Sequence, residues 1–180
     1  MEGSDKVLIL SGDHIYKMDY QKLIKYHQKK NADVTVVAMD VPLEDASRFG
    51  TIFIDDDNRI TDFEEKPKNP RSTLASLGIY IFNKDILIEE LKKDAINESS
   101  THDFGRDILP DLLNKKLYIY RFEDYWKDVG TIDEYWATSM ELLKDNPPIN
   151  FDDWKVTTNF QRNIPADRNP PYISYSADIS

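Results

Sequence analysis

Glycine is scarce in this 180-residue chain, and cysteine is absent. Six glycines make up about 3% of the residues, against a usual share of about 7%. A protein that cradles a nucleoside triphosphate normally uses more glycine, because backbone amides must come close to the phosphates. The absence of cysteine excludes disulfides and thiolate metal sites, and it is consistent with a reducing cytoplasm.

Basic residues and long apolar runs are also in short supply. The 23 basic residues are outnumbered by 33 acidic ones, and the resulting net charge of −10 argues against a nucleic-acid-binding surface. No stretch reaches the ~18 apolar residues of a membrane helix, and the acidic start differs from a signal peptide. We therefore expect neither a nucleic acid nor a membrane as partner. With 40% apolar residues, the chain has the composition of one folded domain with an appendage.

The first forty residues predict the fold class. Val7–Leu10 is a continuous apolar run, typical of a strand buried on both faces in a parallel sheet. Asp19 precedes an amphipathic helix, and Val34–Met39 predicts a second strand. This order is a βαβ unit, so we expect an α/β fold with a mixed, mostly parallel sheet. A buried strand so early in the chain also suggests that the fold is incomplete at the N-terminus.

The rest of the chain predicts one domain and a tail. Proline in Asn146-Pro147-Pro148 ends the last helix, which divides residues 1–146 from residues 147–180. In the tail we expect only a strand at Trp154–Thr158. The remaining predicted elements are a hairpin of Thr51–Ile54 and Ile60–Phe63, strands at Leu77–Phe82 and Leu117–Phe122, and helices at Lys84–Ala95 (Ile86, Leu87 and Leu91 inward), Gly105–Asn114 (bent or split at Pro110) and Thr131–Leu143.

Two aspartates follow predicted strands and are candidate metal ligands. Asp13 comes after the first strand, where open α/β sheets bind their ligands. Asp128 lies in a segment that repeats this order of a carboxylate, a glycine and a helix start. The pair is suited to share one Mg²⁺. Each aspartate also fits a plain structural role, as a helix cap or a turn residue.

A second group of polar residues is suited to a phosphorylated ligand. Lys66 ends a predicted strand and offers a point charge for a phosphate, while Glu65 can accept hydrogen bonds from sugar hydroxyls. A surface ion pair is an equally good reading of these two residues. Ser76 and Asp103 each lie near a glycine that lets backbone approach a ligand, but a strand start and a helix cap explain them as well. The histidines are not at metal-ligand spacing, so zinc is not expected.

Leu8–Tyr20, which reads LILSGDHIYKMDY, resembles a signature of the bacterial glucose-1-phosphate adenylyltransferase family. The similarity covers about Val7–Leu143. The shorter FEEKP motif is shared with transferases of the same superfamily that use other bases. The further matching segments, in order, are Arg48–Gly50, Phe63–Pro67, Ala75–Phe82, His102–Pro110 and Tyr125–Trp136.

The resemblance implies a Rossmann-like nucleotidyltransferase fold and transfer of AMP from MgATP to glucose 1-phosphate, which makes ADP-glucose for glycogen synthesis. By position, Asp13 and Asp128 are expected to bind the catalytic Mg²⁺, and Lys66 the sugar phosphate. The expected sugar-binding residues are Gly50, Glu65, Ser76, Tyr80, Asp103, Phe104 and Trp126.

The chain departs from the family pattern at both ends. It has no Gly-Gly-x-Gly-x-Arg loop to grip the triphosphate, and residues 147–180 match only the start of the family's C-terminal β-helix. We therefore expect this chain alone to be inactive. The family forms tetramers, or hetero-oligomers with a paralogous subunit. Two alternatives remain: a non-catalytic assembly subunit, and a transferase for another base or sugar.

Overall fold

The computed structural model describes residues 5–144 and 146–149. The chain divides into two compact units, described separately below. The first unit comprises residues 1–12 and 18–123, and the second comprises residues 13–17 and 124–180. The predicted strand at Trp154–Thr158, and nearly all of the predicted tail, lie outside the described residues.

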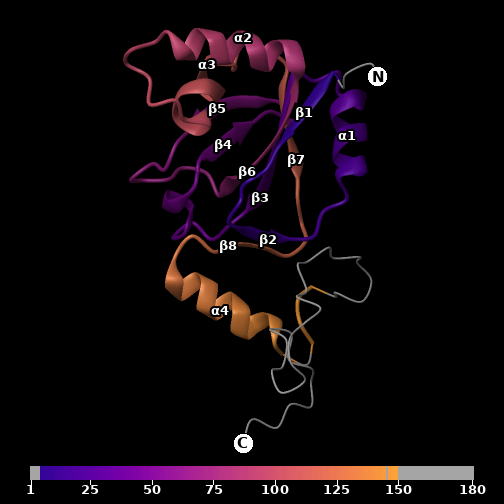
Figure 1. Cartoon of the computed structure of the whole chain (residues 1–180), viewed down its shortest axis with the longest axis vertical. Helices are drawn as coiled ribbons and strands as arrows, with labels where there is room; N and C mark the ends of the chain where they lie inside the picture. Colours follow the sequence, from indigo (N-terminus) through magenta and orange to yellow (C-terminus); the bar gives the residue numbers. More distant parts are fainter. Residues whose placement is uncertain (1–4, 145, 150–180) are drawn as a thin grey trace, which may run out of the picture. The chain divides into compact units, whose positions relative to one another are not determined.

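A six-stranded mixed sheet forms the first unit (Figure 1). The strand order is β5-β4-β6-β3-β7, and β1 pairs with β6 as well. Only β3 and β7 pair in parallel among the named strands described, so the expected parallel majority is wrong, whereas the α/β class and the mixed sheet are confirmed. The strands are β1 (Lys6–Ile9), β3 (Val34–Asp40), β4 (Thr51–Ile54), β5 (Ile60–Glu64), β6 (Leu74–Asn83) and β7 (Leu117–Arg121).

The first strand differs from its prediction in burial and in its neighbours. Strand β6 lies between β1 and β3 and is antiparallel to both, so β1 and β3 run in one direction without pairing. All four residues of β1 are half-buried, and Leu10 is exposed. The apolar run correctly predicted a strand, but within the described residues β1 pairs only with β6.

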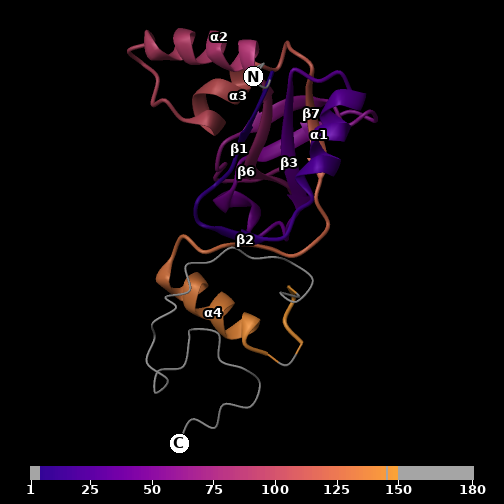
Figure 2. The ribbon, with the colours of Figure 1, turned by 45° about the vertical axis from the view of Figure 1, so that its right-hand side comes forward.

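Helices cover both faces of this sheet. Along β3, side chains alternate between faces, as strand geometry requires. Val34 and Val36 join the core cluster beneath α2 (Lys84–Ala95), whereas Thr35 bonds His27 of α1 (Tyr20–Lys29) at 2.8 Å between Oγ1 and Nδ1. Figure 2 shows α1 and α2 on opposite sides of the strands. The cluster under α2 contains Ile52, Ile60, Phe63, Leu74, Tyr80, Phe82, Leu87, Ile108, Leu109, Leu112, Leu117 and Ile119.

One helical prediction needs correction in detail, and another is confirmed. Leu91 was expected to face inward but is 40% exposed. The buried neighbour is Glu90, whose carboxylate accepts a 2.7 Å hydrogen bond from Lys93 and so can be buried at low cost. The split near Pro110 is confirmed, since a π-helical turn over Phe104–Ile108 gives way to the short helix α3 (Leu109–Asp111). A further short turn spans Ala46–Arg48.

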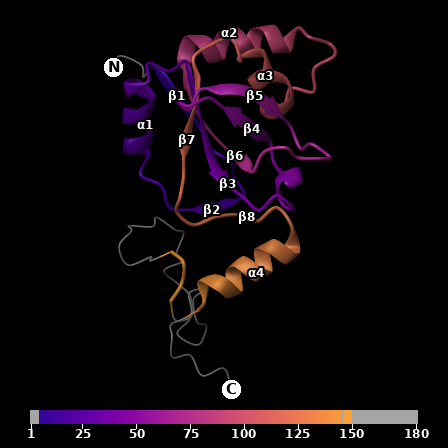
Figure 3. The same cartoon turned by 180° about the vertical axis from the view of Figure 1, so that it is seen from behind.

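The second unit contains a small strand pair that the sequence did not predict. Strands β2 (His14–Tyr16) and β8 (Trp126–Asp128) pair antiparallel, as Figure 3 shows from behind. Helix α4 (Ile132–Leu142) follows, close to the predicted range Thr131–Leu143, and the Thr131 hydroxyl caps it by accepting a bond from the amide of Glu134. Among the described residues, no helix has the length and apolar character needed to cross a membrane.

Candidate functional site

Strand pairing in the second unit brings Asp13 and Asp128 together. Asp128 ends β8 and is the register partner of His14, and Asp13 directly precedes β2. The amide of Val129 donates a 2.9 Å hydrogen bond to the carbonyl of Asp13. Two residues far apart in the sequence therefore occupy adjacent positions because three-residue strands align them.

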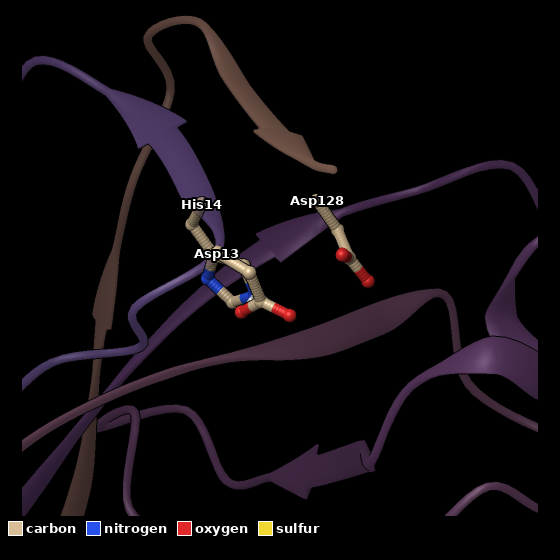
Figure 4. A group of neighbouring side chains, drawn as sticks. All are labelled: Asp13, His14 and Asp128. Carbon is tan, nitrogen blue, oxygen red and sulfur yellow. Dashed lines mark ion pairs between the residues drawn. The ribbon is translucent and has the colours of Figure 1, made fainter. Parts of the chain in front are cut away.

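His14 joins these two aspartates. One potential ligand atom from each of Asp13, His14 and Asp128 lies within 4.8 Å of the others. Figure 4 shows the polar ends of the three side chains projecting to the same side of the ribbon. The imidazole Nε2 of His14 is 3.6 Å from Asp13 Oδ1, and its ring packs edge-on against Trp126 at 4.9 Å between centroids. Sequence analysis missed His14 because it compared only histidine spacings, although its adjacency to Asp13 was a usable signal.

Gly130 leaves room beside the two carboxylates. Its amide donates a 2.8 Å hydrogen bond to Asp128 Oδ1. A Cβ atom at this position would lie 3.0 Å from Asp128 Oδ1 and 3.4 Å from Asp13 Oδ2. Two carboxylates with this spacing suit a hard divalent cation such as Mg²⁺, while an imidazole suits transition metals better. The two carboxylates are therefore of the ligand type that Mg²⁺ prefers, whereas His14 is not.

In the first unit, the carboxylate of Glu65 lies between two glycines. A Cβ atom on Gly50 would come within 2.8 Å of Glu65 Oε2, and one on Gly105 would come within 2.9 Å of Glu65 Cδ. The same hypothetical atom on Gly105 would be 3.3 Å from Asp103 Oδ1. Glu65 and Asp103 thus approach one glycine from two sides, and only the absence of side chains at both glycines makes room for this arrangement.

The environment of Glu65 opposes its ionisation. Burial raises the pKa of the Glu65 carboxyl, and the nearby negative charge of Asp103 raises it further. Lys66 and Arg106 lower the pKa in part, and Lys66 Nζ lies 4.0 Å from Glu65 Oε1. Lys66 has a φ of 44°, a left-handed conformation that is uncommon outside glycine and that often marks a functional position.

Aromatic side chains form the next layer of this site. Tyr80 is 8% exposed and stacks on Phe104 with ring centroids 5.6 Å apart. Burial raises the pKa of Tyr80 to about 12, against a smaller lowering by its hydrogen bond with Ser76. The amide of Ser76 in turn donates a 2.8 Å bond to the carbonyl of Gly50.

The predicted sugar-binding residues therefore separate by unit. The structure brings together six of them in the first unit, and we call this set the Glu65 cluster: Gly50, Glu65, Ser76, Tyr80, Asp103 and Phe104. Lys66 adjoins this cluster with its side chain 63% exposed. Trp126 lies in the second unit, on β8 beside His14.

The fold and the two clusters define an α/β protein with a pair of adjacent aspartates in one unit and a glycine-flanked acidic cluster in the other. The profile of the family described as "Nucleotidyl transferase" matches residues 1–145, and the chain belongs to that family.

Close relatives carry a more specific name. The chain is 51% identical over 177 residues to glucose-1-phosphate adenylyltransferase from Clostridium acetobutylicum, covering 96% of this chain and 45% of the relative. It is 52% identical to the enzyme of that name from Thermosipho melanesiensis, with 97% and 42% coverage. For the Bacillus thuringiensis protein the identity is 49%, with 97% and 46% coverage. The chain spans less than half the length of the curated relatives it matches.

Proposed function

We propose that this chain is part of a glucose-1-phosphate adenylyltransferase, which transfers AMP from ATP to α-D-glucose 1-phosphate and yields ADP-glucose and pyrophosphate. The observation that carries the proposal is an identity near 50% to proteins of that name across nearly the whole chain. The intact clusters around Glu65 and Asp13 support it. The product serves glycogen biosynthesis in the cytoplasm.

The Glu65 cluster binds the sugar in this proposal. The carboxylates of Glu65 and Asp103 accept hydrogen bonds from sugar hydroxyls, and such donors offset the cost of holding two acidic groups near one glycine. Phe104 and Tyr80 provide an apolar wall for the carbon face of the ring. The exposed ammonium of Lys66 neutralises the sugar phosphate, which then attacks the α-phosphorus of ATP.

Asp13 and Asp128 hold Mg²⁺ in this proposal. When bound, the ion neutralises charge that develops on the transferring phosphoryl group. Gly130 keeps the space between the carboxylates open and orients Asp128 through its amide. The acceleration of the reaction comes from positioning and electrostatic stabilisation, because phosphoryl transfer needs no covalent intermediate with the protein.

The proposed partners are ATP, glucose 1-phosphate and further subunits, as a homotetramer or with a paralogous chain. A non-catalytic paralogue is disfavoured because the chain retains Asp13, Lys66 and Asp128 together. Retention of all three is expected only where metal and sugar phosphate are still bound.

Calorimetric titration with glucose 1-phosphate tests the sugar half of the proposal. We expect saturable binding that Lys66→Ala weakens and that the matched exposed variant Lys68→Ala leaves unchanged. Glucose without phosphate should bind more weakly than glucose 1-phosphate, since Lys66 then has no anion to contact. Equal affinity of Lys66→Ala and the unaltered chain would show that this lysine does not bind the phosphate.

Electron paramagnetic resonance with Mn²⁺ as a probe tests the metal half. Asp13→Asn and Asp128→Asn should each weaken binding, because each removes one anionic ligand. Asp56→Asn, a substitution in an exposed turn, is the matched control. If Asp13→Asn and Asp128→Asn bind Mn²⁺ as tightly as Asp56→Asn and the unaltered chain do, the paired aspartates are not the metal site.

A further inference from the structure

The loop that carries Asp103 is held by two carboxylates that the family resemblance does not assign to any role. Residues 96–103 connect α2 to the π-helical turn over Phe104–Ile108, and residues 100–103 are the last part of this loop. Asp94 lies near the end of α2 and Asp107 lies within the turn, and both carboxylates contact residues of this loop. The loop itself is exposed along residues 101–103, so packing alone does not fix its path.

Of the two carboxylates, Asp107 accepts more hydrogen bonds from the loop. A single oxygen, Oδ2, accepts bonds from the Thr101 hydroxyl at 2.6 Å, the Thr101 amide at 3.2 Å and the Asp103 amide at 3.0 Å. These bonds lower the pKa of the Asp107 carboxyl, the bond from the Thr101 hydroxyl being the largest cause. The carboxylate is therefore ionised at neutral pH and holds both ends of the short Thr101–Asp103 segment.

Asp94 contacts two other residues of the same loop. Its Oδ2 lies 2.6 Å from His102 Nδ1, and its Oδ1 accepts a bond from the hydroxyl of Ser100. Ser100 also accepts a 3.0 Å bond from the amide of His102. His102 adopts a φ of 61°, and this left-handed conformation persists because the bonds around it compensate for its cost.

The hydrogen bonds of this loop affect where the side chain of Asp103 lies. Its Oδ1 accepts a 2.8 Å bond from the amide of Arg106, and its charge raises the pKa of Glu65. Two negative carboxylates near Gly105 repel each other, so Asp103 would rotate away from Glu65 if its backbone were free. The bond from the Asp103 amide to Asp107 opposes this rotation, because it fixes the backbone from which the carboxylate projects.

We propose that Asp107 is a positioning residue that holds Asp103 beside Glu65, so that the two carboxylates together recognise neighbouring hydroxyls of a hexose 1-phosphate. This inference rests on the proposed function of the Glu65 cluster. It adds a residue that touches no substrate and acts through the amide of Asp103. Thr101 contributes through its hydroxyl, which donates to the same Asp107 oxygen.

Glucose 1-phosphate titration of four variants of this chain tests the proposal. Asp107→Ala should weaken binding about ten-fold, the scale expected for losing hydrogen bonds to a charged group. Asp111→Ala, an exposed carboxylate four residues on, should bind as the unaltered chain does. Thr101→Val should weaken binding, and Thr101→Ser, which keeps the hydroxyl, should restore it.

A double substitution separates positioning from a general loss of structure. If Asp107 acts through Asp103, adding Asp107→Ala to Asp103→Asn should weaken binding no further than Asp103→Asn does alone. Fully additive losses would overturn the proposal. If Asp107→Ala does not fold, the Thr101 pair decides the question, and equal affinity of the Val and Ser variants would contradict it.

Amide hydrogen exchange measured by NMR supplies a readout that is independent of binding. The Asp103 amide should exchange faster in Asp107→Ala than in the unaltered chain, while amides of the core strand β3 should be unaffected. If the unaltered chain does not bind glucose 1-phosphate, the proposed sugar site fails, and with it this inference. If the unaltered chain binds and Asp107→Ala binds equally well, only the inference fails.

Discussion

The carboxylate of Glu65 is confined by the backbones of Gly50 and Gly105, and this confinement is a property of single residues. Burial and the neighbouring Asp103 both make the charged form of Glu65 costly, so the site favours ligands that donate hydrogen bonds to it. Glycine matters at both positions for space, since a Cβ atom would enter the volume that the Glu65 side chain occupies.

Substitution of Gly105 by alanine should therefore impair sugar recognition. The new Cβ would lie 2.9 Å from Glu65 Cδ, so the carboxylate must move. We expect glucose 1-phosphate affinity to fall by about ten-fold to a hundred-fold, as small displacements in a binding site commonly cause. Calorimetry measures this change. The control is Gly12→Ala, whose Cβ would meet no atom within 4 Å, and equal effects of the two substitutions would contradict the explanation.

His27 should make the stability of the first unit depend on pH. Burial lowers the pKa of this imidazole, which bonds Thr35 and Asn83. Because the folded pKa lies below the unfolded value of about 6.5, the unfolded chain takes up the proton first. This contribution to stability is present above about pH 6.5 and is lost as pH falls toward the lower folded pKa.

Urea unfolding of the unaltered chain and of His27→Gln, at several pH values, measures this effect. Both proteins share every other titrating group, so the difference between their free energies of unfolding isolates the histidine. That difference should shrink from pH 7.5 to pH 5. A difference that stays constant across this range would show that His27 does not titrate as its burial predicts.

At the scale of elements, short strands and caps decide where the site residues lie. Strands β2 and β8 have three residues each, and their register alone places His14 opposite Asp128. Helix α1 begins where Asp19 caps it, accepting a 2.9 Å bond from the amide of Gln21. The helix then buries Leu23 and His27 against the sheet.

Removal of this cap should destabilise the first unit by a measurable amount. Asp19→Ala leaves helix amides without their acceptor and should cost about 1 kcal/mol of unfolding free energy. Asp19→Asn keeps a capping oxygen and should cost much less. Urea denaturation measures both changes. A cost in Asp19→Asn as large as that in Asp19→Ala would mean that charge, and not the cap, supports the helix.

At the scale of the whole molecule, the chain carries the Glu65 cluster, which we propose binds the sugar, and a paired-aspartate cluster, but no Gly-Gly-x-Gly-x-Arg sequence. It also spans less than half the length of its curated relatives. We therefore expect this chain by itself to bind glucose 1-phosphate without releasing pyrophosphate when ATP and Mg²⁺ are added.

An assay for pyrophosphate release tests this expectation. The rate for the unaltered chain should equal that of Asp13→Ala, because neither protein contains the Gly-Gly-x-Gly-x-Arg sequence that the resemblance assigns to the triphosphate. A rate clearly above that of Asp13→Ala would mean that this chain alone completes an active site. Glucose 1-phosphate binding, measured on the same samples, shows whether the protein is folded and retains the sugar half.

The sequence by itself determined the local structure of this protein. Hydrophobic periodicity and caps located α1, α2 and α4, the β4–β5 hairpin and the break near Pro110, because these depend on neighbours within a few residues. The motifs also singled out Glu65 and Asp103 as candidate site residues, and the structure places both beside Gly105. Apart from the β4–β5 hairpin, neither periodicity nor motif spacing contains information on which strands pair.

Only the tertiary structure decided the pairing and the burial that depends on it. Insertion of β6 between β1 and β3 replaced the expected parallel pairing of those two strands with two antiparallel pairings. Glu90 replaced Leu91 as the buried residue of its turn. The pairing of β2 with β8 added His14 to the two aspartates. These outcomes depend on contacts between residues distant in sequence, whose energies a local pattern does not encode. Of the six glycines, Gly50 and Gly105 lie at close approaches to Glu65, and Gly130 lies at a close approach to Asp128.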